Sequence, residues 1–167
     1  MKTALETQAS ELDEQERGFT DAIPEHGWFR TSVLPDDEGP GFSYTTGFHL
    51  NFDYPELVVF SFKSELAHAV LWDVYRDLKA GRRYPIAVAV SDLFGNAEAH
   101  LFPVAKDRYR DLLGWSCWFY GGDEFPCLQL VWPDAGGAFP WQPGASDHAK
   151  SSQPDLTAQV WIKSLAH

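Results

Sequence analysis

The chain has 167 residues, which suits one domain with a single core, and its 44% hydrophobic and 15% aromatic content supplies that core. No apolar run approaches the roughly 20 residues that a membrane-spanning helix needs, so we expect no membrane association. The net charge of −11 and the pI near 4.8 would repel nucleic acids and anionic membrane surfaces, which excludes both as expected partners.

The first part of the chain predicts one helix and then three strands. Residues 1–8 are expected to fray, and Ser10 followed by acidic residues predicts the start of a helix that ends in Pro24–Gly27. The predicted strands are Trp28–Leu34, Phe42–His49 and Glu56–Phe62, and polar loops or turns at 35–41 and 51–55 connect them.

A second helix is predicted from Ser64 to about Ala80. Ser64 is the expected N-cap, and Leu66, Val70, Val74 and Leu78 repeat every four residues as an apolar stripe. Lys79 and Gly81 mark its end. We expect this stripe to pack onto the sheet.

The remaining sequence predicts more strands and one more helix. Strands at Pro85–Ser91 and Ala97–Phe102 are expected to form a hairpin through the turn Asp92–Asn96, and a helix follows at Lys106–Leu113. A strand at Trp115–Tyr120 is expected to pair with Cys127–Trp132 through a turn at 121–124. Gly144–Pro154 predicts a loop, and Leu156–Ile162 a last strand or helix.

Strands come in neighbouring groups and do not alternate strictly with helices. This order predicts an α+β fold with a curved, mostly antiparallel sheet flanked by two or three helices, in one domain over residues 9–167. No secretory signal begins the chain, so we expect a cytoplasmic protein. Cys117 and Cys127 match no zinc or redox motif, and only a hairpin would bring them together as a disulfide.

The charge is unevenly distributed. Residues 1–40 hold ten acids against Lys2, Arg17 and Arg30, a balance of −7. Eight basic residues fall between positions 63 and 110. The sequence therefore suggests an acidic pole that steers a basic protein partner, with ordinary solubility as the alternative explanation.

The segment Phe125–Trp141 combines a buried-strand pattern with a turn built from prolines, glycines and aromatic residues. Trp132, Phe139 and Trp141 are candidates for a preorganised binding wall in this turn. Core packing is the alternative, because most clustered aromatic residues pack inside a protein.

The strand at 42–49 is expected to carry Ser43, Thr45 and His49 on one face. This hydroxyl-rich row can bind a polar ligand or phosphate, or it can be the wet side of a half-exposed sheet. His49 with Asp53 is a weak base-and-orienter pair, and Ser43 is its imagined nucleophile.

Glu56 begins an apolar strand, where burial would raise its pKa and suit acid–base work; a solvent-exposed strand start is the alternative. His26, His49, His68, His100 and Asp134 lack the spacing of metal ligands. We therefore expect no metal and no cofactor.

Several motifs in a fixed order resemble a bacterial family known only as domain of unknown function 4262. They are His26–Trp28, Gly41–Gly47, Tyr54–Val59, Leu128–Asp134, Phe139–Trp141 and Gln153–Pro154. The resemblance covers about residues 12–156 and implies a common fold, but it brings no catalytic residues.

Two function classes stay open, so the sequence does not decide whether the chain is an enzyme. The first is a non-catalytic protein-binding module, such as an acidic immunity or antidote protein that masks a basic partner. The second is an enzyme or sensor for a small polar or anionic ligand in a cleft between the 42–49 strand and the 132–141 turn. The candidate ligand- or partner-binding residues are Ser43, Thr45, His49, Glu56, Gln129, Trp132, Asp134, Phe139 and Trp141.

Overall fold

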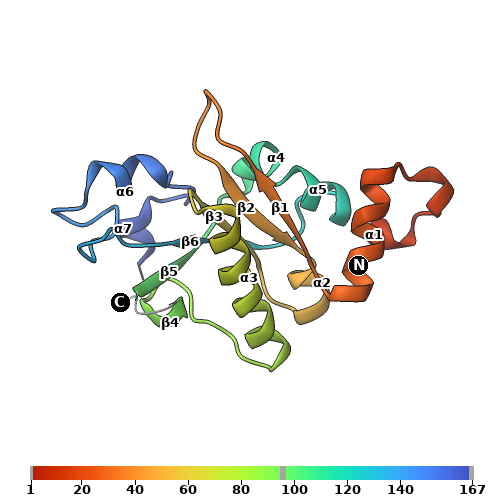
Figure 1. The fold of residues 1–167 in the computed structure, drawn as a ribbon, viewed down its shortest axis with the longest axis horizontal. Helices are drawn as coiled ribbons and strands as arrows, with labels where there is room; N and C mark the ends of the chain where they lie inside the picture. Colours follow the sequence, from red (N-terminus) through yellow and green to blue (C-terminus); the bar gives the residue numbers. More distant parts are fainter. Residues whose placement is uncertain (1, 95–96, 166–167) are drawn as a thin grey trace.

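A computed structural model describes residues 2–94 and 97–165 and places six strands in one open sheet (Figure 1). The strands are β1 (Phe29–Val33), β2 (Phe42–Thr46), β3 (Glu56–Phe60), β4 (Val90–Phe94), β5 (Ala97–Pro103) and β6 (Cys127–Val131). Their order is β1-β2-β3-β6-β5-β4, and β3 with β6 is the parallel pair among antiparallel neighbours. The predicted α+β fold with a mostly antiparallel sheet is confirmed.

Seven α-helices occur within the described residues, more than the two or three predicted. They are α1 (Glu14–His26), α2 (Phe48–Phe52), α3 (Ser64–Lys79), α4 (Tyr109–Leu112), α5 (Gly114–Tyr120), α6 (Asp147–Ser152) and α7 (Trp161–Ser164). The α1 helix lies at one end of the molecule, and α6 and α7 lie at the other (Figure 1). No helix in the described part of the chain is long and apolar enough to cross a membrane.

The core has one main hydrophobic cluster on each face of the sheet. On β3, Leu57 and Val59 belong to the cluster beneath α3, whereas Val58 and Phe60 belong to the cluster that includes α1, α4 and α5. All five residues of β3 are buried, as expected for a central strand that is covered on both faces.

The predicted helix at 64–80 is confirmed as α3, with two corrections. Lys63 is the N-cap, without a side-chain cap, and Ser64 is the first helical residue. Val70, Val74 and Leu78 are buried, but Leu66 is 47% exposed. A step of four residues overshoots a full helical turn by about 40°, so Leu66 lies about 120° around the helix from Leu78.

The predicted strand at Trp115–Tyr120 is wrong, because this segment forms α5. Ser116, Phe119 and Tyr120 are buried at the spacing of three and four residues that brings side chains to one helical face. Gly121 then ends the helix with a φ of 72°, in the left-handed region. The predicted hairpin with β6 therefore does not exist, and Cys117 and Cys127 are free thiols.

The predicted second strand is too long at its C-terminal end. The β2 strand stops at Thr46, because Gly47 adopts a φ of 120° and the chain turns into α2, which contains His49. A side chain at Gly47 would approach the Gly27 carbonyl oxygen to 2.8 Å, so glycine is required here.

The hairpin of β4 and β5 is confirmed, but its first strand is displaced from the prediction. Ala87 has a φ of 64°, which interrupts the predicted strand Pro85–Ser91, and β4 begins only at Val90. The predicted turn residues Asp92–Phe94 belong to β4, and residues 95 and 96 lie outside the described residues.

The two ends of the chain differ from the prediction in detail. Asp13, not Ser10, is the N-cap of α1 and forms a capping box with Glu16. Within residues 1–8, Ala4–Glu6 forms a 3-10 turn in which Ala4 is buried. The predicted loop 144–154 contains α6, and the last predicted element contains only the start of α7.

Candidate functional site

The Glu56 carboxylate is fully buried at the start of β3. It accepts hydrogen bonds from the hydroxyls of Thr45 (2.7 Å) and Tyr120 and from the backbone N–H groups of residues 47–49 (3.0–3.1 Å). These N–H groups belong to the N-cap Gly47 and the first two residues of α2, and the N-terminus of a helix favours a nearby negative charge. Burial raises the pKa of Glu56, and its donors oppose that shift. Glu56 is an internal anchor for α2, so its alternative placement at solvent is wrong.

Ser43 and Thr45 line the sheet face beneath α3 and are 4% and 0% exposed. The Ser43 hydroxyl lies 2.9 Å from that of Ser32, and the Thr45 hydroxyl donates to Glu56 and accepts from the Leu57 N–H group at 3.0 Å. The interpretation of this row as the wet side of the sheet is wrong, because each hydroxyl has a protein partner.

His49 is half-buried in α2, and its ring meets the Tyr120 ring edge-on at 5.5 Å. Burial is the main cause that lowers the pKa of His49, while Asp53 opposes the shift. Among the described residues, no hydrogen bond connects His49 to Asp53 or to Ser43. The arrangement therefore lacks the nucleophile–base–orienter chain of a hydrolytic triad.

Two buried glutamines attach the C-terminal segment to β6. Gln129 donates to the Pro154 carbonyl at 2.7 Å. The Gln153 side chain accepts from the Trp132 N–H group at 2.9 Å and donates to its carbonyl at 2.8 Å, in the manner of a neighbouring strand. The Trp132 indole donates to the Phe60 carbonyl at 2.9 Å. Gln153, which the sequence marked only as part of a motif, is thus the structural partner of Trp132.

Asp134 organises the turn that follows β6. Its carboxylate accepts from three backbone N–H groups at 2.8–3.0 Å, those of Ser146, Gly136 and Ala138. The bond from Ser146 is the largest cause that lowers the pKa of Asp134. Asp134 therefore holds the 134–146 loop closed across its base.

Phe139 and Trp141 belong to an aromatic cluster around His100. Their rings stack at 4.9 Å, and the His100 ring meets them edge-on at 4.4 and 5.0 Å. His100 is 8% exposed, its Nδ1 has no hydrogen-bond partner among the described residues, and burial lowers its pKa. Trp141 is partly buried and also packs against Trp161 at 5.7 Å.

The predicted site residues therefore do not form one site. Thr45 and His49 contact Glu56 at the start of α2, whereas Ser43 contacts Ser32 of β1. Gln129 and Trp132 bind the C-terminal segment, Asp134 closes its own loop, and Phe139 and Trp141 pack against His100. In the part of the chain that the structure describes, no three His, Cys, Asp or Glu side chains form a group suited to a metal ion.

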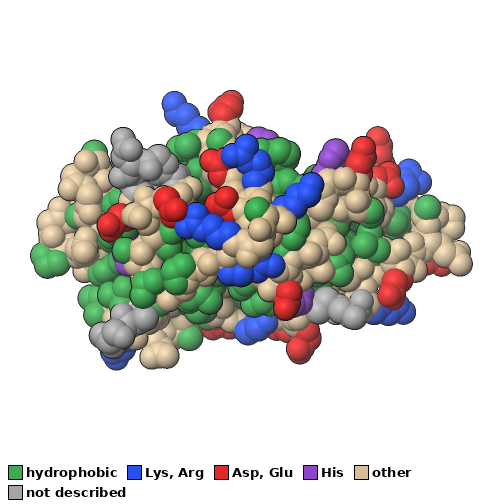
Figure 2. Space-filling view, turned by 90° about the horizontal axis from the view of Figure 1, so that it is seen from below, with side chains coloured by type: hydrophobic (Ala, Val, Ile, Leu, Met, Phe, Trp, Pro, Cys, Tyr) green, Lys and Arg blue, Asp and Glu red, His purple; other side chains and the backbone are tan. Residues whose placement is uncertain are grey.

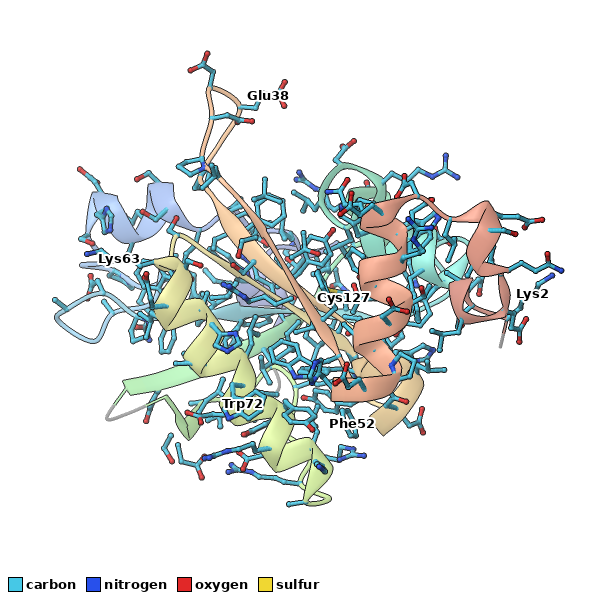
Figure 3. The ribbon with its side chains drawn as sticks, turned by 45° about the vertical axis from the view of Figure 1, so that its right-hand side comes forward. Lys2, Glu38, Phe52, Lys63, Trp72 and Cys127 are labelled. Atoms are coloured by element: carbon cyan, nitrogen blue, oxygen red, sulfur yellow. The ribbon has the colours of Figure 1, made fainter. Side chains whose placement is uncertain are left out.

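Residues 34–41, which we call the hairpin loop, project from the sheet between β1 and β2 (Figures 1 and 3). Asp36 and Gly39 close its tip with two backbone hydrogen bonds, at 3.1 and 3.3 Å. Glu38 points away from the body of the molecule (Figure 3), and Leu34 is 83% exposed. An isolated loop thus presents a large apolar side chain beside acidic ones.

Gly41 fixes the base of the hairpin loop. A side chain at this position would come within 2.8 Å of the Val33 carbonyl oxygen and 2.9 Å of the Pro35 ring. Pro35 and Pro40 restrict the two arms of the loop. The sequence predicted a polar loop here, and the two prolines in it were the signal that its backbone is also restricted.

A groove of about 970 Å³, which we call the hairpin groove, lies beside the hairpin loop. Phe42, Tyr44 and Phe60 of the sheet contribute apolar surface to it. The segment Arg108–Trp115 lines another side, and Leu156 also contributes. Its volume is within the range of ligand-binding clefts, and none of residues 132–141 lines it.

A smaller pocket of about 380 Å³ also borders the hairpin loop, and we call it the serine pocket. Five serines line it: Ser32, Ser43, Ser61, Ser64 and Ser152. Lys63 and His148 are the ionisable residues in its wall, and His148 lies 3.3 Å from the Ser152 hydroxyl. Ser43, one of the predicted site residues, therefore lines this pocket.

The basic residues of the middle of the chain do not form one uniform pole. Arg76 pairs with Asp73, and Arg82 pairs with Asp77 and Asp92. Figure 2 shows the face seen from below, where Lys and Arg side chains gather near the centre with Asp and Glu among them. This face is therefore mixed in charge, whereas the hairpin loop carries acids only.

Comparison with known protein families matches residues 22–146 to the Domain of unknown function (DUF4262). The comparisons with curated proteins and with solved structures gave no match. The matched segment includes β1, the hairpin loop and the sheet strands through β6. The chain belongs to the DUF4262 family.

Proposed function

We propose that this chain is a non-catalytic protein-binding module of the immunity or antidote type, and that the hairpin loop is the centre of its interface with a basic partner. The observation that carries the proposal is the 83% exposure of Leu34 in a loop that also presents Asp36, Asp37 and Glu38. Leu34 follows Val33, which is 37% exposed, so two neighbouring apolar side chains lie beside three acids, and together they offer a partner both an apolar contact and a charged rim.

The shape of the loop supports the same function. The two prolines and the Asp36–Gly39 bonds restrict the backbone before a partner arrives, so less conformational entropy is lost on binding. Among the described residues, no ion pair involves the three carboxylates of the loop. They remain available to attract a basic surface and to speed its association.

The environments of the acidic and basic candidate residues give little support to catalysis. Glu56 and Asp134 each accept several hydrogen bonds from the fold. Within residues 2–94 and 97–165, no nucleophile and no orienting carboxylate forms a hydrogen bond with the His49 ring. Carboxylates whose oxygen atoms already accept several hydrogen bonds from the fold usually have a structural role. A general base needs an oxygen or nitrogen lone pair that is free to accept a proton from the substrate.

Site-specific photo-cross-linking tests the proposal. A benzophenone amino acid replaces Leu34 in the full chain, and a matched variant carries it at Ile162, which is 59% exposed in α7. In extract of the native organism, we expect one discrete adduct from position 34 and none from position 162. Its yield should fall with added salt and in the variant Asp36→Asn/Asp37→Asn/Glu38→Gln. Identical adducts from both positions, or none from position 34, would contradict the proposal.

A second candidate function is the binding of a small polar or anionic ligand in the serine pocket. It is favoured by the group of hydroxyls around Lys63 and His148 and by Ser43, which the sequence also selected. Native mass spectrometry of the purified chain, before and after denaturation, tests it. A released small molecule that is absent from a Lys63→Glu variant would support this function, and an unliganded mass would count against it.

A further inference from the structure

The β1 strand is the outermost strand of the sheet and pairs only with β2 among the described strands. Its first residue is covered, because the Phe29 ring packs against Phe19 of α1 at a centroid distance of 4.1 Å. Ser32 and Val33 at the other end are exposed. This half of β1 therefore has a free edge, where main-chain groups are available to pair with another strand.

The hairpin groove adjoins this free edge. Thr31 and Val33 lie opposite Tyr44 and Phe42 on β2, so their side chains share the sheet face that lines the groove. A strand added beside β1 would continue this face and direct every second side chain into the groove. Trp115, at the start of α5, offers those side chains an aromatic surface.

The charge of the hairpin groove favours a basic segment over a second copy of this chain as its ligand. The charged residues along the groove are three exposed acids, Asp36, Glu38 and Asp111, and one exposed base, Arg108, which gives this part of the surface a net charge of −2. Within the described residues, none of these four side chains forms an ion pair. A second copy of this chain, with its net charge of −11, would be repelled, whereas a basic segment would be attracted.

We infer that the hairpin groove binds an extended, basic segment of the partner, which adds a strand to the free edge of β1. The side chains of every second residue of the segment face the groove. At these positions the segment carries apolar residues, which enter the groove, together with Lys or Arg, which meets the acidic residues of its lining. Pairing is short, because α1 covers the start of β1 and Pro35 has no N–H group to continue the ladder. This inference rests on the proposed function and names the partner's binding segment.

Peptide selection tests the inference without knowledge of the partner. A displayed library of random octapeptides is selected on the full-length chain, with counter-selection on Val33→Lys. Val33 is 37% exposed, so this variant should fold and should place a positive charge over the groove. We expect enriched peptides in which Lys or Arg and aromatic or branched residues occupy the same set of alternate positions. These peptides should bind Val33→Lys at least about tenfold more weakly than the natural chain.

Backbone methylation of an enriched peptide distinguishes strand addition from side-chain binding. In an added strand, alternate N–H groups point toward β1. Methylation of one alternate set should therefore abolish binding, and methylation of the other set should leave it within about threefold. The inference would be overturned if methylation of the two sets weakened binding equally. It would also be overturned if the selected peptides were acidic or shared no pattern, or if they bound Val33→Lys as tightly as the natural chain. A dimer that Val33→Lys dissociates would assign the edge to a second copy and would also overturn it.

The outcomes separate this inference from the proposed function. If position 34 cross-links to a protein but no extended peptide is enriched, the partner binds as a folded surface and only the inference fails. If extended basic peptides bind but position 34 yields no adduct, the groove is functional and the assignment of the hairpin loop as the centre of the interface fails.

Discussion

The Tyr120 hydroxyl donates a hydrogen bond to the buried Glu56 carboxylate, which connects the last residue of α5 to the first residue of β3. The same carboxylate accepts hydrogen bonds from the backbone N–H groups of residues 47–49 at the start of α2. One fully buried side chain thus connects two helices and the central sheet. This explains how a charged residue can begin a strand that is otherwise apolar.

Glu56→Gln should destabilise the fold by about 2–4 kcal/mol, because an amide loses the charge and places N–H donors against existing donors. Tyr120→Phe is the matched control and should cost less, about 1.5–3 kcal/mol, since it removes one donor and leaves the others. Urea unfolding measures both values. An unchanged midpoint for Glu56→Gln would show that this network contributes nothing.

Val74→Asp should lower the free energy of unfolding by about 3 kcal/mol or more, because Val74 has no solvent exposure and the new charge lacks a partner. Leu66→Asp changes the same kind of residue on the exposed side of α3 and should cost about 0.5 kcal/mol or less. Thermal melts of the two variants compare the faces directly. Similar losses in both would refute the observed orientation of α3.

Trp141→Ala should cost about 2 kcal/mol in stability, since the indole packs against Phe139 and His100 but keeps part of its surface exposed. Partner affinity of the folded fraction should not change, because Trp141 does not line the hairpin groove. Binding isotherms and melts of the same preparation separate the effects. A large affinity loss without a stability loss would restore the aromatic turn as a binding wall.

Stability should fall on acidification partly through His100. Burial lowers its folded-state pKa below the ordinary 6.5, with Glu98 opposing the shift. Below pH 6.5, His100 binds a proton more readily in the unfolded chain than in the folded one. The contribution of neutral His100 to the free energy of unfolding is therefore complete above pH 6.5 and is lost as the pH falls toward the folded-state pKa. Denaturation at pH 7.5 and 5.5 should show a smaller decrease for His100→Phe than for the natural chain. His68→Gln is the control and should retain the full decrease.

The sequence predicted correctly those helices and strands in which the spacing of apolar residues matches the pattern of buried side chains. The α3 helix and the strands β1, β3 and β6 lie close to their predicted positions, because their apolar residues repeat as the local structure requires. The α5 helix was predicted as a strand, since Trp118, Phe119 and Tyr120 have high β-propensity and only their tertiary packing favours a helix.

The candidate site was less predictable than the fold. Ser43, Thr45 and Glu56 were selected for their chemistry, but their partners are Ser32, Tyr120 and backbone groups brought close only by folding. The hairpin loop was recognised as a polar loop. Its projection and the exposure of Leu34 depend on what the rest of the chain leaves uncovered, which no local pattern specifies.

The most direct test of the central claim compares two charge-neutralised variants in binding to the protein captured at position 34. The first neutralises the hairpin loop (Asp36→Asn/Asp37→Asn/Glu38→Gln). The second removes three carboxylates near α1 (Glu11→Gln/Glu14→Gln/Glu16→Gln), at a place well away from the loop (Figure 1).

Association kinetics at low and high salt should show that the hairpin variant associates about tenfold more slowly at low salt, with a small change in dissociation. The α1 variant should stay within about twofold of the natural chain, and high salt should reduce the difference. Equal association rates for the natural chain and the hairpin variant would contradict the claim that the hairpin loop is the interface.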